Sequence, residues 1–167
     1  MQKLTPLKYV NGDLIQLAKE GHFNVITHGC NCFNRMKRGI APQMAKAFGC
    51  DKFHMETDEY LPNCGVAAKD LIEKLGNIDW KYNKEFGVIV VNSYTQFHYH
   101  TPSKYGIPLD YDALRMCMRK LNILFKGLHI GLPKIGCGLA GGDWETVEAI
   151  IEEELKDMKV TVVNYVR

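Results

Sequence analysis

The fold prediction starts from a glycine-rich stretch, LPKIGCGLAGGDW, at residues 132–144. An apolar run at residues 128–132 leads into it and a helical pattern at residues 144–155 leads out, which is typical of a strand, a loop and a helix. Its four glycines permit positive φ angles and close approach of the backbone to a ligand. Because backbone amides ahead of a helix N-terminus bind anions, the loop is a candidate cradle for a phosphate or diphosphate. An ordinary strand-to-helix turn accounts for the same residues equally well.

Length and composition favour one domain over residues 1–167. Hydrophobic residues make up 46% of the chain and charged residues 24%, as in soluble globular proteins. The net charge is +2 and no lysine- or arginine-rich run suggests a patch that tracks a phosphate backbone, so the sequence carries no strong nucleic-acid signal. No apolar stretch approaches the roughly 20 residues that span a bilayer, and the N-terminus lacks the apolar core of a secretion signal. We therefore expect a cytoplasmic protein with no membrane partner.

The cysteines and histidines predict neither a metal site nor a cofactor. Six cysteines lie at positions 30, 32, 50, 64, 117 and 137 without a CxxC pair. The spacing of Cys30 and Cys32 is too tight for a zinc knuckle, and disulfides are rare in the cytosol, so free and mostly buried thiols are expected. His98 and His100 could chelate a metal from one face of a strand, but no cysteine or carboxylate stands near them in the sequence.

Strand and helix patterns alternate along the chain. We predict strands at residues 7–10, 24–28, 86–92, 128–132 and 159–165, and helices at 14–19, 40–48, 111–124 and 144–155. Asp13, Asp110 and Asp143 stand where N-caps are expected, and Gly49 stands where a helix ends. The less regular part is assigned as possible helices at 51–60 and 70–75, a short strand at 64–68, a hairpin turn at 76–84 and a long surface loop at 97–106. The alternation predicts an α/β domain with a mixed or mostly parallel sheet covered by helices.

Four polar loops follow predicted strands, at Asp13, at residues 31–39, at residues 94–96 and at residues 136–142. Ligands of open α/β sheets collect at the carboxyl ends of the strands, so these loops are expected to converge. Two of them contain glycine and open helices, which favours a ligand that carries phosphate. Residues 136–141 fit the pattern GxGxxG, but only one strand follows them, which excludes a classical dinucleotide-binding dehydrogenase. No Walker A pattern is present.

Several short motifs together resemble the macrodomain family. They are Asp13 after Asn11-Gly12, the strand end THGCN at residues 27–31, Gly39-Ile40-Ala41 at the start of a helix, and PKIGCGL at residues 133–139. The branch they most resemble contains the terminal ADP-ribose protein glycohydrolases and the ADP-ribose-1''-phosphate phosphatases. The resemblance implies a three-layer α/β/α sandwich with a mixed central sheet that binds ADP-ribose in a cleft.

The resemblance also implies roles for individual residues. Asp13 would accept a hydrogen bond from the adenine amino group, Leu14 would offer its backbone nearby, and Tyr165 would lie beside the base. Asn31 would lie by the distal ribose, with Thr95 and Gln96 in the neighbouring loop. The remaining ligand-binding residues are those expected to surround the diphosphate and the distal ribose: Gly39, Ile40, Ala41, Lys134, Ile135, Gly136, Cys137, Gly138, Leu139 and Ala140.

Two positions depart from the glycohydrolase pattern. Gln96 stands where that branch has an attacking lysine, and Ala140 stands where it has an aspartate. Glutamine forms no Schiff base and alanine takes no proton, so the covalent mechanism of that branch is not expected. The candidates for catalysis are then Asn31 to orient a water, His28 to shuttle a proton, and Asp143 as a carboxylate. His28 could equally be a buried histidine at a strand end, and Asp143 an N-cap.

Three functional hypotheses remain open. The first is a hydrolase acting at the distal ribose, most simply releasing phosphate from ADP-ribose-1''-phosphate, with cleavage of ADP-ribose from a modified protein or nucleic acid as a variant. The second is a module that binds ADP-ribose without turnover, which the missing lysine and aspartate favour. The third is a structural domain with a decayed cleft, which the retained glycines and Asn31 make less attractive.

Overall fold

A computed structural model describes residues 6–53, 71–99 and 106–166 of the chain. Its strands are β1 (Leu7–Gly12), β2 (Val25–Asn31), β3 (Ile78–Asn83), β4 (Val88–Gln96), β5 (His129–Leu132) and β6 (Lys159–Tyr165). They form one sheet in the order β1-β6-β5-β2-β4-β3. All neighbouring pairs are parallel except β3 with β4. The five parallel strands therefore end at one edge of the sheet, which confirms the predicted mixed sheet.

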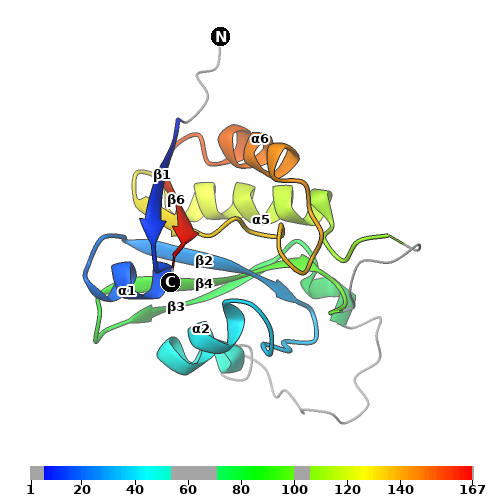
Figure 1. The fold of residues 1–167 in the computed structure, drawn as a ribbon, viewed down its shortest axis with the longest axis horizontal. Coiled ribbons are helices and arrows are strands. Elements are labelled where there is room, and N and C mark those ends of the chain that lie inside the picture. The colour runs from blue at the N-terminus through cyan, green and yellow to red at the C-terminus, as the bar shows by residue number, and fades with distance from the viewer. Residues whose placement is uncertain (1–5, 54–70, 100–105, 167) are drawn as a thin grey trace.

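Helices cover both faces of this sheet (Figure 1). α5 (Tyr111–Leu124) and α6 (Trp144–Glu154) lie side by side on one face, while α1 (Leu14–Lys19) and α2 (Ala41–Phe48) lie on the other. Each face has its own apolar core, one built with α5 and α6 and the other with α1 and α2. The three-layer α/β/α prediction is thus confirmed. No helix among the described residues has both the length and the apolar character needed to cross a membrane.

Of the four α-helices that lie wholly within the described residues, three begin at a capping aspartate. The carboxylates of Asp13, Asp110 and Asp143 accept from the backbone amides of Gln16, Ala113 and Thr146, respectively. These bonds satisfy amides that have no partner within the helix, and they confirm the three predicted N-caps. α2 differs, because it follows Ile40 without a side-chain cap.

Some predicted elements have different bounds or a different type. The hairpin turn expected at 76–84 is wrong, because most of it is the edge strand β3. β2 and β4 continue into the polar residues that were assigned to loops, ending at Asn31 and Gln96. The described parts of the two possible helices contain 3₁₀ turns at Cys50–Lys52 and Ile72–Lys74, and the adjoining residues Phe53 and Leu71 are helical. Residues 54–70, with the predicted strand at 64–68, lie outside the described residues.

Gly131 lets β5 pack against Phe23. A Cβ added at Gly131 would lie 2.7 Å from ring carbons of Phe23, which is itself buried. We therefore expect Gly131→Ala to lower the free energy of unfolding by about 2 kcal/mol, because the ring must shift within a close-packed core. Urea denaturation would measure this loss. In a Phe23→Leu background the same substitution should cost clearly less, whereas equal costs in both backgrounds would contradict the clash.

Candidate functional site

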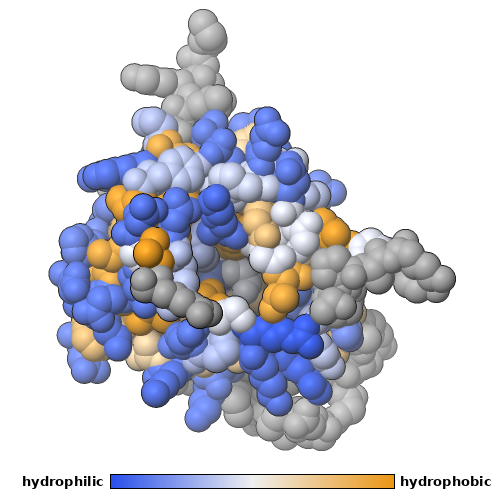
Figure 2. Space-filling view, in the orientation of Figure 1, coloured by the Kyte–Doolittle hydropathy of each residue, from blue (hydrophilic) through white to orange (hydrophobic). Residues whose placement is uncertain are grey.

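A cleft of about 390 Å³ opens at the carboxyl ends of β2, β4 and β5. Figure 2 shows the molecule in the orientation of Figure 1, with a recess near the centre of a largely hydrophilic face. Residues 31–39, here called the cationic loop, form the wall on one side of the cleft. Residues 133–142, here called the glycine loop, form the wall on the other side. The β4 end and the start of α2 complete it. Three of the four predicted polar loops therefore meet at one site.

Most of the predicted ligand-binding residues line this cleft. They are Asn31, Gly39, Ile40, Ala41, Gln96, Lys134, Ile135, Gly136, Gly138, Leu139 and Ala140. Eight further lining residues were not predicted, namely Gly29, Cys30, Arg35, Met36, Lys37, Arg38, Tyr99 and Pro133. Two signals in the sequence bear on this group: the motifs at 27–31 and 133–139, which contain Gly29, Cys30 and Pro133, and the density of cations at residues 35–38.

Five of the residues predicted to bind the ligand lie outside the lining. Asp13 and Leu14 follow β1 at the start of α1, and Tyr165 ends β6, which pairs with β1 in parallel so that both strands finish on the same side of the sheet. The Tyr165 side chain is exposed there, so its ring is accessible to a ligand. Thr95 is fully buried behind Gly29, and its hydroxyl has no hydrogen-bond partner among the described residues. Cys137 lies in the glycine loop without lining the cleft.

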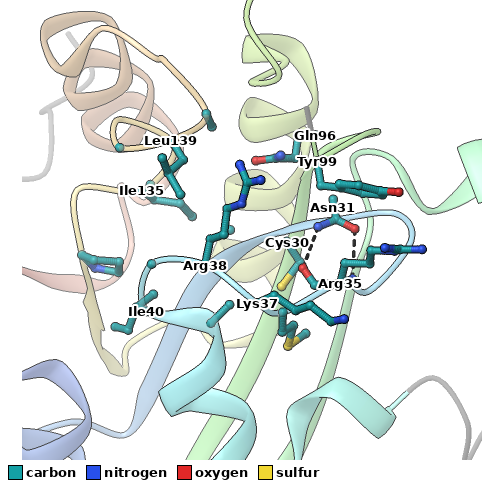
Figure 3. Close-up of a pocket in the computed structure, with 18 of the residues that line it drawn as sticks. Cys30, Asn31, Arg35, Lys37, Arg38, Ile40, Gln96, Tyr99, Ile135 and Leu139 are labelled. Carbon is teal, nitrogen blue, oxygen red and sulfur yellow. Dashed lines mark hydrogen bonds between the residues drawn. The ribbon is translucent and has the colours of Figure 1, made fainter. Parts of the chain in front are cut away.

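The cleft is strongly cationic. Arg35, Lys37, Arg38 and Lys134 line it, and no aspartate or glutamate does so within the described part of the chain. Figure 3 shows the Arg38 side chain extending across the opening toward Gln96 and Leu139, while Lys37 runs in another direction. The Arg35 guanidinium stacks over the Tyr99 ring at 4.7 Å from its centroid. Four positive charges around one opening favour an anionic ligand.

The start of α2 adds backbone donors to the same wall. Gly39, Ile40 and Ala41 line the cleft at the N-terminus of this helix. Among the described α-helices, α2 alone has no capping side chain, so its first amides are left for another acceptor. The helix dipole adds partial positive charge at this point. The arrangement suits a phosphate group.

Two polar side chains that line the cleft, those of Asn31 and Gln96, are held by hydrogen bonds to nearby residues. The Asn31 side chain donates to the Arg35 carbonyl at 2.9 Å, and its oxygen accepts from the Arg35 amide (Figure 3). The same oxygen also accepts from the Phe33 amide. The Gln96 amide donates to the His98 carbonyl at 2.7 Å. Asn31 therefore shapes the cationic loop as well as facing the cleft, and one of its N–H bonds remains for a ligand or water.

His28 and Asp143, the other two candidates for catalysis, do not line the cleft. His28 is fully buried and its Nε2 lies 2.8 Å from the Asn92 side-chain oxygen. Burial lowers the pKa of His28 to about 4, so the ring is neutral at pH 7. The Asp143 carboxylate accepts from the amide and the hydroxyl of Thr146, as an N-cap does.

The thiols near the cleft are unsuited to nucleophilic chemistry. Burial raises the pKa of Cys137 to about 11, and it raises the pKa of Cys30 well above the ordinary value. Both side chains therefore stay protonated at neutral pH, and a protonated thiol is a weak nucleophile. Within the described residues, no group of three or more histidine, cysteine, aspartate or glutamate side chains is placed to hold a metal ion.

Sequence comparison finds relatives along nearly the whole chain, although no protein-family model matches it. An uncharacterized 17.5 kDa protein from the tk-vs intergenic region of enterobacteria phage T4 is 32% identical over 165 residues, covering 95% of this chain and 96% of the phage protein. Human ADP-ribose glycohydrolase OARD1 is 27% identical over 162 residues, covering 93% of this chain and 90% of the human protein.

Solved structures of the same fold come from several organisms. A protein of unknown function from Bacteroides thetaiotaomicron matches with a TM-score of 0.72 and 28% identity, covering 96% of this chain and 98% of its own. The macrodomain of Mycobacterium tuberculosis DarG matches with a TM-score of 0.63 and 22% identity over 95% and 97% of the two chains. A Trypanosoma brucei macrodomain in complex with ADP-ribose matches with a TM-score of 0.61 and 13% identity, covering 98% of this chain and 69% of its own.

Proposed function

The chain shares the fold of macrodomains, and we propose that it is a member of that family that binds ADP-ribose in the cleft and releases phosphate from ADP-ribose-1''-phosphate. The observation that carries the proposal is the meeting of the uncapped α2 N-terminus, the cationic loop and the glycine loop around one opening. Backbone amides from two loops, with arginine and lysine beside them, are the groups that bind a diphosphate.

The order of the strands around the cleft indicates which end of ADP-ribose would lie on which side. β1 and β6 lie beyond β5 on one side of the cleft, so adenine is proposed to lie near Asp13 and Tyr165. The exposed Tyr165 ring can stack on a base. β2 and β4 lie on the other side, so the distal ribose is proposed to lie near Asn31 and Gln96.

The proposed reaction is attack of water on the phosphorus of the 1''-phosphate. The bond between phosphorus and the oxygen on C1'' breaks, that oxygen takes up a proton, and inorganic phosphate leaves. The free N–H bond of Asn31 can hold the water or a phosphate oxygen, and Arg35 stands in the same wall of the cleft. Because no carboxylate lines the described cleft, catalysis here depends on positioning and on stabilising negative charge.

A second candidate is a module that binds ADP-ribose without turnover. It is favoured by the absence of any carboxylate or accessible histidine among the described lining residues, since such groups move protons in most hydrolases. Cleavage of ADP-ribose from a modified protein or nucleic acid is the third candidate. It is supported by the likeness to an ADP-ribose glycohydrolase, while Gln96 and Ala140 argue against a covalent lysine mechanism.

Binding and turnover can be tested separately. Calorimetry with ADP-ribose should show saturable binding, with AMP clearly weaker because it lacks the diphosphate. Incubation with ADP-ribose-1''-phosphate should release inorganic phosphate, and ADP-ribosylated protein and oligonucleotide should be offered in parallel. If the protein binds ADP-ribose and forms no product from any of these substrates, the second candidate, a binding module without turnover, is supported. Absence of binding to every one of these ligands would overturn the proposal.

Arg38 gives a sharper test of how the diphosphate is held. Its guanidinium extends across the opening, so we expect Arg38→Ala to weaken ADP-ribose binding roughly tenfold through loss of a charge-assisted hydrogen bond. Lys84 is the matched control, because it is an exposed cation in the turn between β3 and β4, at the opposite edge of the sheet. Calorimetry should give Lys84→Ala an affinity within about twofold of the wild type. If both variants lose the same ADP-ribose affinity, Arg38 contributes only through the net charge of the protein and makes no specific contact with the diphosphate.

A further inference from the structure

The cationic loop turns at Asn34, which adopts an unusual backbone conformation. Its φ is +54°, and Asn34 is the one residue other than glycine with positive φ in the described parts of the chain. Side chains disfavour this left-handed region, although asparagine tolerates it better than most. The turn is closed by a hydrogen bond from the Asn34 amide to the Asn31 carbonyl. Arg35 follows Asn34 directly and Arg38 lies three residues further on, so the direction of this turn affects where both cations point.

Two side chains from elsewhere in the fold hold Asn34 in place. The Lys74 ammonium donates to the Asn34 side-chain oxygen and, at 3.3 Å, to the Cys32 carbonyl. The Asn34 side-chain nitrogen donates to the Tyr94 hydroxyl at 2.9 Å. Both ends of the amide are thus engaged, and Lys74 also lies over the Tyr94 ring. Neither Lys74 nor Tyr94 lines the cleft.

The Tyr94 end of this arrangement is fixed inside the protein. Its hydroxyl donates to the Asp79 carboxylate, which also accepts from the Asn92 side chain at 2.7 Å. Asn92 is fully buried, and Tyr94 is buried but for 2% of its surface. Burial, with Asp79 beside it, raises the pKa of Tyr94, so the hydroxyl stays protonated and donates. The turn is therefore tied to the rigid pair β3 and β4.

We propose that Lys74 and Tyr94 are positioning residues for the cleft: they hold Asn34, and through it they hold the cationic loop in the conformation that presents Arg38 and the α2 N-terminus to a diphosphate. This inference rests on the proposed function for its ligand. Lys74 and Tyr94 act on ligand affinity through the loop, because a loop ordered before binding loses less conformational freedom when the ligand binds.

The experiment compares Lys74→Met, Tyr94→Phe and Asn34→Gly with the wild type. Asn34→Gly keeps the positive φ and deletes the side chain that both partners hold. Lys120→Met is the matched control, because Lys120 likewise donates to a carbonyl, that of Gly76, and to an asparagine side chain, far from the cationic loop in sequence and outside the cleft lining. Two quantities are measured: hydrogen exchange of the amides at 35–39 without ligand, and the Kd for ADP-ribose by calorimetry.

In the three test variants we expect exchange at residues 35–39 to rise about tenfold or more and ADP-ribose affinity to fall by about tenfold. Lys120→Met should leave both unchanged, and urea midpoints should show that all four variants stay folded. Unchanged exchange at 35–39 would overturn the inference, as would faster exchange with unaltered affinity. If the wild type binds no ADP-ribose, the proposed function fails, while the exchange data still decide whether Lys74 and Tyr94 hold the loop.

Discussion

Replacing Gly142 by alanine is expected to lower the free energy of unfolding by about 3 kcal/mol and to weaken ADP-ribose binding roughly 100-fold. A Cβ at this position would lie 2.3 Å from the Leu109 Cδ2 atom and 2.6 Å from the Gly136 carbonyl oxygen. The Gly142 amide donates to that same oxygen at 2.8 Å, so relieving the clash breaks a hydrogen bond within the glycine loop. The loop that lines the cleft must therefore change shape.

Leu109 explains why so small a change has a large effect. It is buried, its amide donates to the Ala140 carbonyl, and its side chain also fills the space beside Gly136. The glycine loop is wrapped around this side chain, and interiors packed at this density resist an added methyl group. A loop displaced from Leu109 no longer directs its amides at the ligand, and loss of that preorganisation lowers affinity without removing any side chain.

Gly138 provides the control for stability. It lies in the same loop, has an ordinary φ, and a Cβ there would meet no atom within 4 Å. Gly138→Ala should therefore change the urea midpoint little, while Gly142→Ala shifts it strongly, and near-ultraviolet circular dichroism should confirm that both variants remain folded. In a Leu109→Ala background the cost of Gly142→Ala should shrink. A Gly142→Ala protein with wild-type stability and affinity would refute the packing argument.

The elements that sequence predicted well are those with strong local signals. The aspartates at 13, 110 and 143 each cap a helix, and the glycine at 49 ends one in the left-handed conformation, because these preferences act within a single turn of the chain. The glycine loop was likewise predicted as part of the binding site, and most of its residues line the cleft. The roles proposed for individual residues toward a ligand remain predictions.

The errors have a common physical origin in tertiary contacts. The sequence assigns the polar ends of β2 and β4 to loops, yet Ser93 and Thr95 are buried strand residues. β3 was missed because it is an edge strand with exposed Trp80 and Tyr82, so it lacks a continuous apolar run. Only the folded sheet brings Tyr99 and Arg35 together at the cleft. Local sequence patterns do not predict contacts between residues that lie far apart in the chain.

His28 yields the second large prediction, a loss of stability in acid. The Asn92 nitrogen donates to the Cys50 carbonyl and to Asp79, so its oxygen is the acceptor, and the proton of the neutral ring is on Nε2. Nδ1 has no partner among the described residues. Protonating it would place a charge at a buried site that offers no acceptor, which is why burial lowers the pKa of His28 to about 4 from 6.5.

The folded and unfolded chains bind different numbers of protons at His28, and this difference sets the direction in which stability changes with pH. Between about pH 6.5 and pH 4 the unfolded chain binds a proton at His28 and the folded chain does not, so stability falls as the pH falls. A tenfold difference in proton affinity corresponds to about 1.4 kcal/mol, so the full loss from this residue is about 3 kcal/mol near pH 4. Below that pH both states are protonated and the contribution becomes constant.

His28→Gln is the variant that isolates this effect, because glutamine can donate to Asn92 and does not titrate. Urea denaturation at pH 7 and pH 4.5 should show a stability loss that is smaller in the variant by about 2 kcal/mol. His129, whose pKa is also lowered by burial, and Asp79, whose pKa burial raises, titrate in both proteins, so the difference between the two proteins cancels them. If both proteins lose the same free energy of unfolding, the pKa of His28 is the same in the folded and unfolded chains, and burial does not lower it. A smaller loss in the variant would instead identify His28 as a structural residue of β2, neutral throughout the range in which a proton shuttle would have to work.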